Sequence, residues 1–361
     1  MDLYLLIGTA PYFCFLVIIF SGLLFRKPIK TNQTHIPFVS VVISARNEEK
    51  NIPYLLKDLI NQSADKKNFE VIIANDRSND KTKNIIDQFS SENSFMKSIH
   101  IERKHEMTPK KYALTKAIEN SKGEIILTTD ADCRVPRDWV SNMAQLAQNN
   151  EGIVIGYSKI ESMKTFLNEF QKIDFLGIMA ANGGLLTHGI VCSGSGQNLA
   201  YKKKDFQNIN GFNPVKDLLS GDDMYLVQSI SSIKGAVFNY DPNSFVSTLP
   251  KNSFPSYLNQ RIRWSSNSKQ NLRSNPQFFV FLLSAFLANC SVMFGLIYFS
   301  GLSIVLFLIK FFLEAFVIFI GTRLFLTPVS SLTYIIWNII QPVYIPIVGL
   351  AGLIGKYSWK E

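Results

Sequence analysis

The chain has 361 residues, 47% of them hydrophobic, and its mean hydropathy of +0.11 is high for a soluble protein. Its formal net charge is +9, but no zinc knuckle, helix-turn-helix pattern or basic-aromatic repeat accompanies that charge, which argues against a nucleic-acid partner. Anionic lipid and phosphate groups are the simpler partners. The four cysteines show no paired metal-ligand spacing, which predicts free thiols.

Apolar residues are concentrated at the two ends of the chain. Residues 3–25 are almost uncharged and about long enough to cross a bilayer, and residues 278–355 could supply further spans of roughly 20 residues each. We expect about three spans in this second region, near 278–299, 301–321 and 332–354. Inside it, Lys310 and Glu314 are one helical turn apart, which predicts an ion pair; a role in guiding a substrate is the alternative.

Positive charge follows the first apolar segment and does not precede it. Only Asp2 comes before that segment, whereas Arg26, Lys27 and Lys30 come after it. A cleaved signal peptide carries its positive charge before the apolar core, so this pattern favours a retained anchor. The positive-inside tendency then places the polar middle of the chain in the cytoplasm. Further basic residues before the next apolar run agree with this orientation: Arg261, Arg263, Lys269 and Arg273.

The middle of the chain alternates strand and helix patterns. Apolar runs at 39–43, 71–74 and 124–129 predict buried strands. A helical pattern with Ile52, Leu55, Leu56 and Leu59 on one face follows the first strand, and a second helix is expected to begin near Asp80. This alternation predicts an α/β fold with a largely parallel sheet, whose ligands bind at the carboxyl ends of the strands. Neither G-x-G-x-x-G nor a P-loop follows the first strand.

Polar side chains follow each of these strands. Asn47 and Glu48 follow the first, Asp76 the second, and Asp130 and Asp132 the third. Residues two apart on an extended segment project from the same side, so the last two carboxylates are expected to share one site. A divalent cation with hard oxygen ligands, Mg²⁺ or Mn²⁺, would relieve their repulsion. A polar loop with turn-forming aspartates is the alternative.

Six short segments occur in an order that resembles a known family. They are "VVISARNEEKNI", "FEVIIANDRSNDKT", "PKKYALTKAI", "TTDAD", "GDDMYL" and "QRIRW". Together they resemble the inverting glycosyltransferases of family 2, which have the GT-A fold. The resemblance runs from about residue 39 to 264. The flanking apolar segments resemble the membrane-bound branch with cellulose and hyaluronan synthases and ceramide glucosyltransferases.

The resemblance implies a nucleotide site at the first two turns. Asn47 and Glu48 match the N-E pair near the nucleotide, although Asn47 could equally cap a helix. Asp76 matches the aspartate that contacts the base. Arg77 stands where the family has glycine, and Asn75 where it has the first aspartate.

A lysine and two aspartates are implied to hold the donor's diphosphate. Lys110 matches the lysine of the family's G-K pair, with Pro109 in place of glycine, and would neutralise phosphate; a solvated surface charge is the alternative. Asp130 and Asp132 match the D-x-D motif, whose carboxylates hold a divalent metal against the diphosphate. The implied cofactor is therefore Mg²⁺ or Mn²⁺.

Two further motifs are implied to act on the acceptor side. Asp223 matches the aspartate that takes the proton of the acceptor hydroxyl, and Asp222 precedes it; a pair of N-cap residues for a helix from Met224 onward is the alternative. Gln260, Arg263 and Trp264 match Q-x-x-R-W. There the arginine would bind the departing diphosphate and the tryptophan would face the acceptor, while both residue types also anchor proteins at membrane interfaces.

Two other segments allow less specific predictions. Residues 193–206, "SGSGQNLAYKKKDF", match a family segment near the acceptor but could be a tight turn. Residues 165–186 have mixed amphipathic character and would form an interfacial helix or part of the core.

The sequence thus predicts an integral membrane glycosyltransferase with a cytoplasmic GT-A domain, at the inner membrane if bacterial. Its expected parts are an anchor at 1–25, a catalytic domain at 36–250, an interfacial segment at 251–277 and membrane helices at 278–355. The predicted reaction moves a sugar from a nucleotide donor, expected to be a UDP-sugar, to a lipid or polysaccharide. The alternatives are a processive synthase, completed by an oligomer or a partner protein, and a catalytically silent nucleotide-sugar-binding scaffold.

Overall fold

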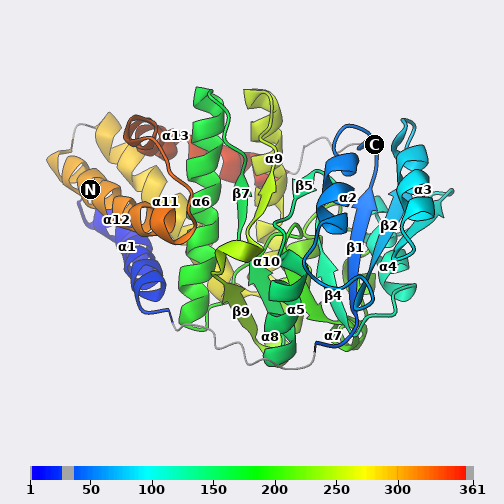
Figure 1. Cartoon of the computed structure of the whole chain (residues 1–361). Helices are drawn as coiled ribbons and strands as arrows, with labels where there is room; N and C mark the ends of the chain where they lie inside the picture. Colours follow the sequence, from blue (N-terminus) through cyan, green and yellow to red (C-terminus); the bar gives the residue numbers. More distant parts are fainter. Residues whose placement is uncertain (1, 27–35, 299, 355–361) are drawn as a thin grey trace. The chain divides into compact units, whose positions relative to one another are not determined.

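A computed structural model describes residues 2–26, 36–298 and 300–354 of the chain (Figure 1). The predicted cationic residues Lys27 and Lys30 lie outside the described residues. Internal contacts divide the chain into two compact units. The first comprises Met1–Lys27, Ile160–Cys192 and Pro250–Glu361, and the second comprises Pro28–Lys159 and Ser193–Leu249.

The second unit is built on a seven-stranded sheet in the order β3-β2-β1-β4-β8-β6-β9. Four of its strand pairs are parallel, and β8 runs antiparallel to both β4 and β6. The predicted α/β class with a mostly parallel sheet is confirmed. The strands are β1 Val39–Ala45, β2 Phe69–Asp76, β3 Met96–Ile101, β4 Ile125–Thr128, β6 Ile153–Gly156, β8 Leu199–Lys202 and β9 Ala236–Asn239. A small sheet adds β5 Cys133–Arg134, β10 Val246–Thr248 and β7 Ser158–Ile160.

Side chains alternate between the two faces of this sheet, and helices cover both faces. Val41 and Ile43 of β1 belong to a buried core that also contains residues of α2, α3 and α5, whereas Val42 points to the opposite face. On that opposite side α4 packs against β1 and β2. The helices of this unit are α2 Ile52–Ile60, α3 Thr82–Glu92, α4 Pro109–Glu119, α5 Trp139–Asn149, α7 Lys203–Asn208 and α8 Asp222–Lys234.

The apolar stripe predicted for the first helix is its core face. Ile52, Leu55, Leu56 and Leu59 of α2 are fully buried. Burying one such side chain contributes about 1.5–3 kcal/mol, so these four residues fix the helix against the sheet. The polar turn that precedes the helix is thereby held at the carboxyl end of β1.

The first unit is a helical bundle. In the described part of the chain, four helices are long and apolar enough to cross a membrane, as expected of a membrane protein. They are α1 Asp2–Leu24, α11 Pro276–Ile297, α12 Gly301–Leu324 and α13 Ser331–Ile354. Figure 1 shows α1 beside α11 and α12. The same unit contains α6 Phe166–Thr187, α9 Phe254–Ser266 and α10 Ser268–Ser274.

Helix α6 crosses α1 at two glycines. A Cβ on Gly22 would lie 2.0 Å from the carbonyl oxygen of Gly184, so only glycine permits this close approach. Most of α6 is buried, which favours the core alternative for residues 165–186 over the interfacial one. Residues 160–192 group with the apolar helices, whereas the predicted domain boundaries at 36 and 250 stay a prediction.

A cluster of polar side chains lies inside the bundle of apolar helices. Lys310 Nζ is 2.9 Å from Glu314 Oε2, which confirms the predicted pair. Gln341 Oε1 accepts a second hydrogen bond from Lys310 at 2.9 Å. The Glu314 carboxylate also accepts hydrogen bonds from Tyr12 at 2.8 Å and Asn338 at 2.6 Å. The cluster therefore joins α1, α12 and α13.

Candidate active site

The turns after β1 and β2 are hydrogen-bonded to each other, and each contains a residue with a left-handed backbone conformation. Asn47 has φ 54° and Arg77 has φ 50°. The Asn47 N–H donates to Ser78 Oγ at 3.0 Å, and the Asn79 N–H donates to Asn47 Oδ1 at 2.8 Å. The turn after β2 thus keeps the left-handed backbone that glycine favours, although this chain carries arginine there.

Glu48 lies between these turns and the start of α2. Its N–H donates to Thr82 Oγ1 at 2.8 Å, and its carboxylate accepts a hydrogen bond from Asn51 Nδ2 at 2.8 Å. The N-cap residue of α2 is Asn51. The alternative that Asn47 caps this helix is therefore wrong. The Asn47 side chain instead accepts a hydrogen bond from the turn after β2.

Asp76 is buried at the end of β2 beneath two arginines. Arg77 Nε donates to its Oδ1 at 2.8 Å and Arg77 Nη2 to its Oδ2 at 3.2 Å. Arg46 Nη1 donates to the same Oδ2 at 3.4 Å. The Asp76 side chain is only 4% exposed, against 18% for Arg77 and 23% for Arg46. Guanidinium groups therefore form the exposed part of this cluster.

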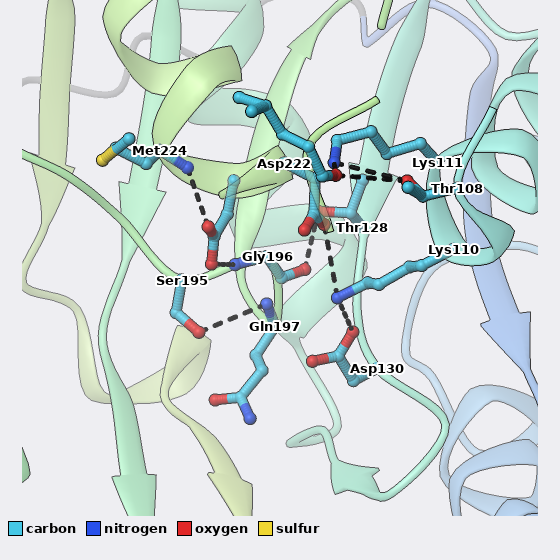
Figure 2. Close-up of polar contacts among 12 residues, drawn as sticks. Thr108, Lys110, Lys111, Thr128, Asp130, Ser195, Gly196, Gln197, Asp222 and Met224 are labelled. Atoms are coloured by element: carbon cyan, nitrogen blue, oxygen red, sulfur yellow. Dashed lines mark hydrogen bonds and ion pairs between the residues drawn. The ribbon is translucent and has the colours of Figure 1, made fainter. Parts of the chain in front are cut away.

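Lys110 joins the carboxyl end of β4 to the start of α8. Figure 2 shows its Nζ between Asp130 Oδ1 at 2.8 Å and Asp222 Oδ2 at 3.4 Å. The neighbouring Lys111 is buried and donates to the Leu218 carbonyl. The structure thus brings the predicted Lys110, and not its neighbour, to the two carboxylates.

The charge of Lys110 is strongly favoured by these neighbours. Burial lowers the pKa of Lys110, but the carboxylates of Asp130, Asp222 and Asp223 outweigh it and raise that pKa above its ordinary value. The neighbouring Lys111 also acts on Asp222 and Asp223, so two ammonium groups face three carboxylates. The carboxylates outnumber the ammonium groups, and the cluster can accept a further cation.

Asp223 is held by backbone amides. The Gly196 N–H donates to its Oδ2 at 3.2 Å, and the Met224 N–H donates to its Oδ1 at 2.8 Å. Thr128 Oγ1 in turn donates to the Gly196 carbonyl at 2.9 Å, which fixes this loop to the end of β4 (Figure 2). A Cβ on Gly196 would lie 3.6 Å from Lys110 Nζ, so the loop of residues 193–198 covers the cluster closely.

The two adjacent aspartates have opposite pKa shifts. Burial raises the pKa of Asp223, and the negative Asp222 raises it further. Burial also acts on Asp222, but Lys110 and Lys111 outweigh it and lower the pKa of that carboxyl. The N-cap of α8 is Gly221, so the predicted capping role of Asp222 is wrong. Asp222 is instead a counterion of Lys110.

Asp130 and Asp132 lie on a turn. Strand β4 ends at Thr128, and the Cys133 N–H donates to the Asp130 carbonyl at 3.1 Å. The expected extended backbone is therefore wrong, because the chain turns at these residues, and their shared site stays a prediction. Asp132 is half-buried, and Cys133 Sγ lies 3.8 Å from its Oδ1.

Among residues 2–26, 36–298 and 300–354, no group of three or more His, Cys, Asp or Glu side chains could hold a metal ion. Mg²⁺ is commonly bound by one or two carboxylates together with substrate phosphates, so a pair of aspartates suits a metal that arrives with a diphosphate. The four cysteines, all within these ranges, are free thiols as predicted.

Family models match most of the chain. A model of glycosyl transferase family 2 matches residues 40–209, and one of glycosyl transferase family group 2 matches residues 125–352, more than half of the chain. The chain belongs to glycosyl transferase family 2. The resemblance predicted from six motifs is confirmed. The roles of the individual site residues stay predictions.

Several curated proteins resemble this family 2 member over part of their length. Probable glycosyltransferase YdaM of Bacillus subtilis is 27% identical over 255 residues, which cover 69% of this chain and 60% of that protein. Beta-monoglucosyldiacylglycerol synthase of Nostoc sp. is 34% identical over 134 residues, 36% of this chain and 28% of that protein. Poly-beta-1,6-N-acetyl-D-glucosamine synthase of Staphylococcus epidermidis is 23% identical over 273 residues, which cover 75% of this chain and 63% of that protein. The chain thus spans less than two thirds of each relative.

A solved structure shows the same fold as this family member. Mannosyltransferase PcManGT from Pyrobaculum calidifontis, in complex with GDP-Man and Mn²⁺, superposes with a TM-score of 0.66 at 19% identity. The match covers 98% of this chain and 99% of that chain. The predicted GT-A fold with flanking apolar helices is confirmed.

The Q-x-x-R-W residues of this family member lie on α9, in the helical unit. Gln260 Oε1 accepts a hydrogen bond from Arg261 Nη1 at 3.1 Å, and Arg261 Cζ lies 4.2 Å from the centre of the Trp264 ring. Arg263 is half-buried on the same helix. The motif's predicted contact with the donor stays a prediction.

Sequence reasoning missed the importance of Arg261. In the sequence, Arg261 is one of the basic residues that indicate a cytoplasmic side. In the structure its side chain is 5% exposed, and its Nε donates to Asp174 Oδ2 at 2.6 Å. Tyr257 also donates to Asp174, at 2.8 Å. The sequence signal was weak, because Asp174 is one of three charged residues in α6, with Glu169 and Lys172, and no local pattern identified its partner.

Proposed function

We propose that the protein transfers a sugar from a nucleoside-diphosphate donor, expected to be a UDP-sugar, to a lipid or saccharide acceptor at a membrane, with inversion at the anomeric carbon. The observation that carries this proposal is the cluster in which Lys110 joins Asp130 to Asp222 beside Asp223. These groups come from three separate segments and meet at the carboxyl ends of the strands, where α/β sheets bind their ligands.

Asp130 and Asp132 would hold Mg²⁺ or Mn²⁺ together with the donor diphosphate. When bound, the metal would neutralise the charge that develops on the leaving diphosphate. Lys110 would contact the same phosphates, since its ammonium group is partly exposed and already faces Asp130. Asn47, Glu48 and Asp76 would line the nucleotide end of the site.

Asp223 is the proposed general base. Its carboxylate takes the proton of the acceptor hydroxyl while that oxygen forms a bond to the anomeric carbon, and the bond from this carbon to the diphosphate oxygen breaks. The amides of Gly196 and Met224 hold the carboxylate in one orientation. Attack opposite the leaving group inverts the configuration. Arg263 would bind the departing diphosphate and Trp264 would face the acceptor, with Gln260 in the same motif.

The acceptor proposal rests on the apolar helices and on the relatives. Within the described residues four helices could cross a membrane, and one relative is named for a glucosyldiacylglycerol product and another for a polymer of N-acetylglucosamine. We propose a membrane location with the catalytic unit in the cytoplasm, at the inner membrane if the source is bacterial. A processive synthase is the second candidate, favoured by the second of these relatives.

The test measures release of nucleoside diphosphate from a panel of sugar nucleotides by full-length protein in detergent with total membrane lipid, in Mn²⁺ or EDTA. We expect metal-dependent release from one donor, together with a glycosylated lipid or polymer, and loss of both in Asp223→Asn. The exposed Asp217 offers a matched control, since Asp217→Asn should retain activity.

A product bearing one sugar would favour a simple transferase, and a long polymer would favour the processive synthase. Folded protein that binds nucleotide but releases none from any donor, with lipid or saccharide supplied, would contradict the proposal and favour the silent scaffold.

A further inference from the structure

The arginine that follows β2 adopts a backbone conformation that suits it poorly. Arg77 has φ 50°, in the left-handed region where glycine is the favoured residue. The resembled family has glycine at this position. A residue kept in a sparsely populated conformation points to a role for its side chain, because the backbone alone would be better served by glycine.

The side chain of Arg77 covers the carboxylate that the family resemblance assigns to base recognition. Arg77 donates to both oxygens of Asp76, at 2.8 and 3.2 Å, and Arg46 approaches one of them at 3.4 Å. With Asp76 only 4% exposed, a nucleobase cannot reach its carboxylate while Arg77 remains in place. A ligand arriving here meets N–H donors first.

The chemistry of this surface favours an acceptor edge. A guanidinium group carries five N–H donors and no acceptor, and Arg77 uses two of its donors on Asp76. The Arg46 Nε is buried and has no hydrogen-bond partner among the described residues. Such donors suit a carbonyl oxygen, which uracil and guanine carry, whereas adenine has no carbonyl oxygen and offers only ring nitrogens as acceptors.

We propose that Arg77 is the specificity-determining contact to the donor's nucleobase, donating to a base carbonyl oxygen while Asp76 holds the guanidinium in position. This inference rests on the proposed function, since it concerns the donor of that reaction. It assigns Asp76 as a positioning residue, in contrast to the direct base contact that the resemblance implies. It also predicts that the site prefers a carbonyl-bearing base to adenine.

The test compares the binding of UDP, GDP, ADP and inorganic pyrophosphate, each with Mn²⁺, to the full-length protein by titration calorimetry. For Arg77→Gly we expect the better of UDP and GDP to bind about tenfold more weakly, the size of a lost hydrogen bond to a charged group. Pyrophosphate and ADP binding should be unchanged. The melting temperature should change little, because glycine adopts this backbone readily, and Asp76 keeps Arg46 as a partner and becomes open to solvent.

Asn210 provides the matched control for the backbone. It also has a positive φ, 61°, so Asn210→Gly makes the same kind of change without touching the cluster, and nucleotide affinity should not change. If Arg77→Gly fails to fold, Arg77→Lys carries the test. It keeps the charge but loses the two-pronged contact with Asp76, and the same selective loss is expected.

Three results would overturn the inference. The first is unchanged affinity of Arg77→Gly for UDP and GDP. The second is an equal loss of pyrophosphate affinity, which would assign Arg77 to the phosphates. The third is wild-type binding of ADP as tight as that of UDP and GDP. The proposed function fails separately, if the wild type binds no nucleoside diphosphate at all.

Discussion

Two lysine–carboxylate clusters in this protein have similar chemistry and opposite surroundings. The Lys310 and Glu314 side chains are 0% and 4% exposed, whereas those of Lys110 and Asp130 are 27% and 28% exposed. Around Glu314, amide and phenol groups supply further hydrogen bonds, and one positive charge meets one negative charge. Around Lys110, the ammonium groups of Lys110 and Lys111 face three carboxylates.

The difference separates a structural network from a binding site. A buried ion pair with matched charges and added hydrogen bonds has little to offer a ligand, and its effect is to fix the helices that carry it. A partly exposed cluster with excess negative charge can accept a cation, and its lysine can turn to a phosphate that arrives with that cation. Mutations in the Lys310 cluster should therefore change the stability of the protein, and mutations in the Lys110 cluster should change its affinity for the ligand.

The largest effect is expected when the Lys310 pair is broken. Lys310→Met leaves the Glu314 charge buried without its cation, which should lower the free energy of unfolding by about 3–5 kcal/mol. Chemical unfolding in detergent measures it. Lys310→Met/Glu314→Gln removes both charges and should recover most of the loss. If Lys310→Met alone were as stable as the wild type, the network would not be structural.

A smaller effect, on affinity, is expected at the exposed cluster. Lys110→Met removes the ammonium that would contact the diphosphate, which should weaken nucleoside diphosphate binding by about 1.5–3 kcal/mol, the range for hydrogen bonds to charged groups. Titration calorimetry with Mn²⁺ measures it. The melting temperature should fall less than in Lys310→Met. The reverse order of melting temperatures would contradict the comparison.

The elements were easier to predict than the contacts between them. Runs such as 39–43 identify strands because β-branched and apolar residues suit a buried sheet, and the stripe from Ile52 to Leu59 repeats at the helical period. The choice between Lys110 and Lys111 depends on how α4 packs, which adjacent identical residues do not reveal. The partnership of Asp174 with Arg261 joins helices far apart in the chain, and no local pattern marks it.

The smallest effect is a shift in pH dependence within the exposed cluster. A general base must be deprotonated, so activity is present above the pKa of Asp223 and is lost as the pH falls through it. That pKa is raised by burial and then by the negative Asp222. Asp222→Asn removes the second influence, so the acid limb of the kcat/KM profile should move to lower pH. A limb that stays in place, or moves to higher pH, would show that Asp222 does not act on the base.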